Sequence, residues 1–159
     1  MRSFLDRLAQ LAVVFGALCL TVMTAIITYQ VVARYVFNSS PAWSERLSLV
    51  LLAYLVFFGA AAGVRLGFHI CITAIRDAMP GPVASVFISA THILVAAAGL
   101  VILLAGFQLT TTLWEFAIPS LGIPRGLALL PLPVCGGMII LFSIANLIGL
   151  GPEEQAEAA

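Results

Sequence analysis

The sequence has little of what a water-soluble domain needs on its surface. It contains no lysine, and charged residues make up only 9% of its 159 residues, whereas soluble domains carry roughly 25%. Hydrophobic residues account for 62%. Because so few polar side chains cannot cover a water-facing surface, the composition excludes an ordinary soluble domain and indicates a protein whose solvent is lipid.

Several classes of function lack the residues that they require. The formal net charge is zero and no basic run occurs, so the sequence does not predict nucleic-acid binding. Phosphate-binding Gly-Lys motifs, nucleophile elbows and metalloprotease motifs are also missing, so we expect neither an enzyme nor a bound cofactor. The three cysteines, Cys19, Cys71 and Cys135, show no metal-ligand spacing and are expected to pack as small apolar residues.

The sequence consists mainly of four long uncharged runs, at residues 8–33, 47–64, 83–114 and 127–150. A hydrocarbon core of about 30 Å needs roughly 20 helical residues, and a helix satisfies its own backbone in lipid. The alternation typical of a membrane barrel is absent. We therefore predict an all-α membrane protein, with four transmembrane helices in a single domain over 1–159 and a flexible acidic tail at 151–159.

The connections between these runs also carry structural signals. Residues 67–82 alternate apolar and polar side chains at helical spacing, which predicts a short helix in the membrane interface with His69 and Arg76 on its polar side. The third run is too long to cross upright, so we expect it to tilt. Residues 115–126 should form an ordered but irregular loop, and Pro131 and Pro133 should kink the fourth helix.

A tight hairpin is predicted between the first two helices. Pro41 suits the first turn of a helix, Glu45 lies near the positive end of its dipole, and Trp43 is an interfacial anchor. Asn38 lies in the preceding turn, and Arg34 ends the first run. Arg34 and Glu45 either clamp this hairpin and reach the headgroups, or contact a partner subunit; the sequence leaves both interpretations open.

Two further patterns in the sequence could serve binding. Gly59, Gly63 and Gly67 form a small-x-x-x-small stripe, which lets another helix approach closely, either within this chain or from another protein. The only histidines, His69 and His92, suggest the alternative of a haem-binding membrane anchor for a redox enzyme. The uncharged runs contain no carboxylate and therefore do not predict a carrier that works alone.

The order of the motifs resembles a known family. Residues 32–38 (VARYVFN), 40–45 (SPAWSE), 55–61 (LVFFGAA) and 69–70 (HI), followed by Pro119, residues 122–124 (GIP) and 130–133 (LPLP), are similar to the small membrane subunit of tripartite ATP-independent periplasmic (TRAP) transporters, the DctQ-like family. The resemblance covers essentially the whole chain.

This resemblance implies a multi-pass protein of the bacterial inner membrane that pairs with a large DctM-like transport subunit. A periplasmic DctP-like binding protein would deliver the substrate, typically an organic acid, and uptake would be coupled to sodium. The small subunit would then be a non-catalytic scaffold. Arginine placement favours cytoplasmic termini by four residues to three, with Arg2, Arg7, Arg65 and Arg76 on the side of the termini and Arg34, Arg46 and Arg125 on the other.

Overall fold

The computed structural model describes residues 2–38, 41–66 and 81–148. They form the helices α1 (Arg2–Val36), α2 (Ala42–Leu66), α4 (Gly81–Thr112), α5 (Arg125–Leu129) and α6 (Pro131–Leu147). Four stretches are long and apolar enough to cross a membrane: Ser3–Val36, Ala42–Leu66, Ser89–Thr112 and Arg125–Leu147. The prediction of an all-α protein with four such helices is confirmed. Residues 67–80 of the predicted interfacial helix and the predicted acidic tail lie outside the described residues.

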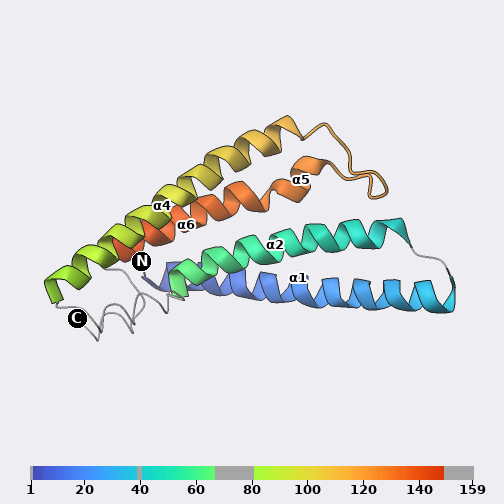
Figure 1. Cartoon of the computed structure of the whole chain (residues 1–159), viewed down its shortest axis with the longest axis horizontal. Helices are drawn as coiled ribbons and strands as arrows, with labels where there is room; N and C mark the ends of the chain where they lie inside the picture. Colours follow the sequence, from blue (N-terminus) through green and yellow to red (C-terminus); the bar gives the residue numbers. More distant parts are fainter. Residues whose placement is uncertain (1, 39–40, 67–80, 149–159) are drawn as a thin grey trace.

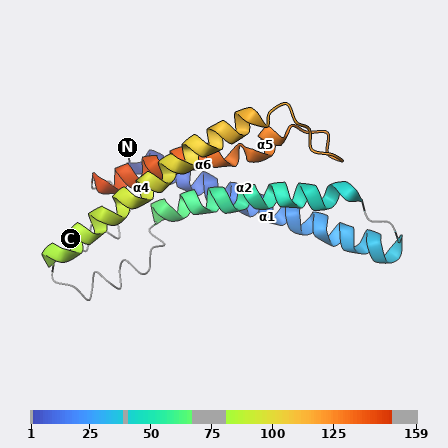
Figure 2. The ribbon, with the colours of Figure 1, turned by 45° about the horizontal axis from the view of Figure 1, so that its top comes forward.

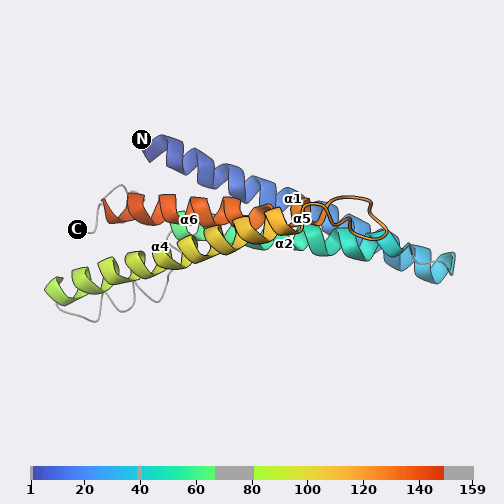
Figure 3. The same cartoon turned by 90° about the horizontal axis from the view of Figure 1, so that it is seen from above.

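The helices form an open row rather than a closed bundle (Figure 1). Their order is α1, α2, α6 and α4, because α1 packs mainly on α2, α2 also packs on α6, and α6 packs on α4. The start of α1 and the ends of α2 and α6 lie at one end, called the terminal end below. The opposite end, which holds the turn between α1 and α2, is called the hairpin end. The order persists in a second view (Figure 2), and α1 and α4 spread apart toward the terminal end (Figure 3).

The contact between α1 and α2 is a seam with a heptad period. Apart from Leu8, the residues of α1 that are buried or half-buried recur at alternating steps of four and three: Leu5, Ala9, Ala12, Gly16, Cys19, Met23, Ile26, Gln30 and Ala33. On α2 the same alternation runs through Ser44, Ser48, Leu51, Leu55, Phe58, Ala62 and Arg65. This is the pattern of an antiparallel coiled coil. Its small residues bring the two backbones close together, as transmembrane helix packing requires.

Glycines on α4 and α6 allow these two helices to approach equally closely. A Cβ on Gly136 would lie 2.5 Å from the backbone nitrogen of Leu103, and one on Gly106 would lie 2.8 Å from the Cβ of Leu132. Gly99 is similarly filled by Ile139, at 2.8 Å. These glycines therefore serve helix packing, and α4 continues through Gly99 and Gly106 as one helix of 32 residues.

The fourth membrane-spanning segment is broken, as its prolines predict. α5 ends at Leu129 and α6 begins at Pro131, with Leu130 between them. A proline at position 131 has no backbone N–H to donate to the carbonyl of Leu127, four residues earlier, and Pro133 similarly offers none to Leu129. The helix therefore changes direction where two of its hydrogen bonds are missing.

The loop before α5 is irregular but held by its own backbone, in agreement with the sequence. Ile118 N–H donates to the Ile123 carbonyl at 2.8 Å, and Arg125 N–H donates to the Phe116 carbonyl at 2.7 Å. Ser120 adopts a left-handed conformation with a φ of 76°. Its hydroxyl lies 3.4 Å from the Ala42 carbonyl, so the loop touches the beginning of α2.

Adjacent glycines on α6 provide a matched test of the packing. We expect Gly136→Ala to destabilise the fold by about 1–3 kcal/mol, because the added methyl meets the backbone of α4. Gly137 has open space where its Cβ would be, so Gly137→Ala should be neutral, or stabilising by up to about 1 kcal/mol through helix propensity. Unfolding of both variants in detergent measures the difference. Equal stabilities would contradict the close α4–α6 approach.

Candidate functional site

Arg65, near the end of α2, joins three helices at the terminal end. Its Nε and Nη2 atoms donate hydrogen bonds to Oδ1 of Asp6 on α1, at 3.0 and 2.8 Å. Its Nη1 atom donates a hydrogen bond to Oδ1 of Asn146 on α6, at 3.0 Å. The amide nitrogen of Asn146 donates in turn to the Val64 carbonyl at 3.2 Å. Asp6, Arg65 and Asn146, with this carbonyl, are called the Arg65 network below.

Burial makes the Arg65 network strongly dependent on its partners. The Arg65 side chain is only 1% exposed, whereas that of Asp6 is 54% exposed. Leaving a buried charge without its partner costs roughly 3–5 kcal/mol, because the charge then has neither water nor a counter-charge. Asp6 on α1 therefore offsets the positive charge of Arg65. Asn146 on α6 accepts a hydrogen bond from another N–H group of the same guanidinium.

The sequence interpretation missed this network. From the sequence, Arg65 bears only on membrane orientation, and the first uncharged run begins after Arg7, which leaves Asp6 outside the predicted span. In the structure α1 begins at Arg2 and includes Asp6. The available signal was three polar side chains at the ends of otherwise apolar runs, because ionisable residues in such segments are usually paired.

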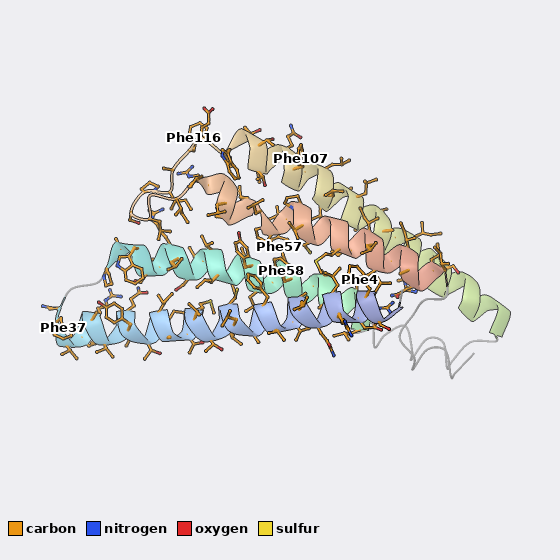
Figure 4. All side chains as sticks on the ribbon, turned by 180° about the vertical axis from the view of Figure 1, so that it is seen from behind. Phe4, Phe37, Phe57, Phe58, Phe107 and Phe116 are labelled. Atoms are coloured by element: carbon orange, nitrogen blue, oxygen red, sulfur yellow. The ribbon has the colours of Figure 1, made fainter. Side chains whose placement is uncertain are left out.

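A second polar link from α2 compensates for the break in the fourth span. The Tyr54 hydroxyl donates to the Leu127 carbonyl at 2.7 Å, the acceptor that loses its normal partner because residue 131 is proline. Nearby, the Cys135 thiol lies 2.8 Å from the Phe57 carbonyl. Figure 4 shows Phe57 on the side of α2 toward α6 and Phe58 toward α1. α2 thus contacts the fourth span on one side and α1 on the other.

The predicted hairpin residues gather at the hairpin end. Arg34, Asn38 and Glu45 are exposed, and the described residues show no ion pair between Arg34 and Glu45. Trp43 stacks on Tyr29 with ring centroids 6.3 Å apart, which ties the start of α2 to the last turns of α1.

Pro41 lies directly before α2, which begins at Ala42, rather than inside the first turn where the sequence places it. Its carbonyl accepts a hydrogen bond from the Ser44 hydroxyl at 2.7 Å. Asn38 adopts a left-handed φ of 51°, a conformation that asparagine tolerates better than most residues. Together these two features turn the chain from α1 into α2.

The glycine stripe is partly within the described residues. Gly59 is exposed, with no neighbouring heavy atom within 4 Å of its Cβ position, so this glycine does not serve packing within the described chain. Gly63 is half-buried. Gly67, His69 and Arg76 lie outside the described residues.

The remaining histidine, His92, is half-buried on α4. Across 2–38, 41–66 and 81–148, His, Cys, Asp and Glu side chains form no cluster of three or more that could hold a metal ion. The polar contacts reported above join helices to one another. We therefore take the candidate functional site to be the exposed outer faces of the helices and the hairpin end, which these contacts hold in place.

The Tyr54 link can be tested by removing one oxygen atom. We expect Tyr54→Phe to lower the unfolding free energy by about 1 kcal/mol, because the Leu127 carbonyl would then keep only the long 3.4 Å hydrogen bond from the Leu130 N–H. Tyr29→Phe removes the same atom from a ring that is already 55% exposed and serves as the control. Denaturation in mixed micelles compares them; identical losses would show that Tyr54 is not the replacement donor.

Comparison with known proteins places these features in a family. The family described as "Tripartite ATP-independent periplasmic transporters, DctQ component" matches residues 23–151. The sialic acid TRAP transporter small permease protein SiaQ of Vibrio cholerae is 28% identical over 120 residues, which cover 76% of this chain and 69% of that protein.

Two Haemophilus influenzae proteins, named provisionally as TRAP transporter small permease proteins, are also similar. One is 26% identical over 67% of this chain and 64% of its own length. The other is 29% identical over 81% of this chain and 80% of its own length. With the family match extending over most of the sequence and four helices able to span a membrane, the chain belongs to the DctQ family, the small permease subunits of TRAP transporters.

Proposed function

We propose that this chain is the scaffold subunit of a sodium-coupled TRAP transporter, and that it packs against the large DctM-like subunit. As a DctQ family member with four apolar spans, it is a multi-pass bacterial inner-membrane protein and a transporter component rather than an enzyme. The observation that carries the proposal is the open row of helices, whose outer members expose large apolar side chains such as Leu18, Val101 and Leu104. Family membership favours this function over a haem anchor.

The outer face of α2 is the surface that we assign to the large subunit. Gly59 and Ala60 are exposed there, and Gly59 leaves room for an approaching helix backbone. In lipid, close approach of small residues is a main source of helix association. Gly59 of the glycine stripe therefore acts between subunits, the second of the two alternatives that the sequence left open.

The hairpin end is the surface that we assign to the periplasmic DctP-like binding protein. With cytoplasmic termini, as the arginine balance favours, the exposed Arg34, Asn38, Trp43 and Glu45 face the periplasm beside the loop at 115–126. The substrate is an organic acid. One relative is named for sialic acid, which is such an acid, but the residues that select it would lie in the other subunits.

Co-expression of the tagged chain with its large subunit tests this function. We expect a stable complex in detergent and, in vesicles supplied with the binding protein, uptake that requires both this chain and a sodium gradient. A chain that purifies alone, together with uptake that persists without it, would contradict the proposal.

Two glycine variants refine the same experiment. Gly59→Leu should reduce the yield of complex several-fold, because the new side chain fills the space for the partner helix. Gly137→Leu adds the same side chain at another open position, on α6, and should leave the yield unchanged. Equal yields for both variants would remove the outer face of α2 from the interface.

A further inference from the structure

We propose that the Arg65 network determines which faces of the two helical hairpins dock against each other. One hairpin is α1 with α2, and the other is α4 with α5 and α6. Within each hairpin, small residues and glycines bring the backbones close over many turns. The Arg65 network lies at the junction between the hairpins, where packing is less extensive, and acts there as a specificity device.

The apolar part of this junction has little power to select an arrangement. Its buried members are Ala61 of α2 with Cys135 and Ile139 of α6, together with the cluster of Leu5, Ala9, Phe142 and Ala145. In lipid, such side chains gain little from leaving the hydrocarbon, because the acyl chains are equally apolar. Other apolar faces of the same hairpins could make comparable contacts.

The Arg65 network removes this ambiguity through Asn146. Asp6 and Arg65 pair within the first hairpin, and Asn146 of the second hairpin completes the network only where α6 lies beside both Arg65 and Val64. Asp6 balances the charge of Arg65, and Oδ1 of Asn146 accepts a hydrogen bond from Nη1 of Arg65. Asn146 is used at both ends of its amide, since its nitrogen donates to Val64. A rotated or shifted α6 would separate Asn146 from both of these partners on α2.

This role is distinct from adding stability. Replacing a buried ion pair by apolar side chains of similar size is often neutral or stabilising, whereas a single buried polar group can specify helix register and partner choice. We therefore expect that removal of both charges leaves each hairpin intact and loosens the choice of docking. Asp6, Arg65 and Asn146 are positioning residues in this account.

Cysteine cross-linking of the full chain in bilayers, in complex with the large subunit, distinguishes the two roles. The junction is reported by Ala61→Cys with the native Cys135, which share one buried cluster, in a Cys19→Ala, Cys71→Ala background. The first hairpin is reported by Gly16→Cys with Leu55→Cys, where the Gly16 Cβ position lies 3.4 Å from the Leu55 side chain, with all native cysteines replaced by alanine.

The expected result is a selective loss of the junction cross-link. In Asp6→Ala/Arg65→Met, and separately in Asn146→Leu, its rate of formation should fall at least fivefold, while the hairpin cross-link changes less than twofold. Arg7→Met removes an exposed positive charge beside Asp6 and should change neither rate. An unchanged junction rate would overturn the proposal, and a parallel fall of both rates would overturn it by assigning the Arg65 network to hairpin stability.

Discussion

The burial of one guanidinium group, at the junction of three helices, is the constraint that sets how the two hairpins of this fold dock. Lipid supplies no hydrophobic drive for helices to associate, so close backbone contact and polar links must hold them together. Arg65 cannot lie in the junction unless Asp6 and Asn146 lie there too. α2, which carries Arg65 and Tyr54, is consequently the helix to which both α1 and the broken fourth span are attached.

This arrangement has a consequence for function. The polar side chains that join the helices are directed toward α2 or come from it, which leaves the outer faces of α1 and α4 apolar and exposed along most of their length. A row of helices linked through its middle members presents broad surfaces on its two outer helices. Such a shape suits a subunit that supports another protein's movement, and it agrees with the family to which the chain belongs.

Much of the fold could be predicted from composition and run length, because lipid leaves helices as the simplest solution for long apolar segments. The four spans, the hairpin before Ala42 and the proline break near Leu130 follow from local signals. The Arg65 network did not, because pairing of Asp6, Arg65 and Asn146 depends on which helices become neighbours. Likewise, the stripe at Gly59 was recognisable, whereas the close packing of Gly136 against α4 required the three-dimensional arrangement.

The proposed scaffold role requires that this subunit keep its shape while the large subunit transports. Its most direct test is a distance measurement between spin labels at Val36→Cys on α1 and Thr112→Cys on α4, with the native cysteines replaced, in the assembled transporter. Both positions are exposed, each at the last residue of its helix. We expect the same distribution of distances between the two labels without ligands and with sodium plus substrate. A ligand-dependent shift of several ångströms, about the size of a helix movement in transport, would contradict it.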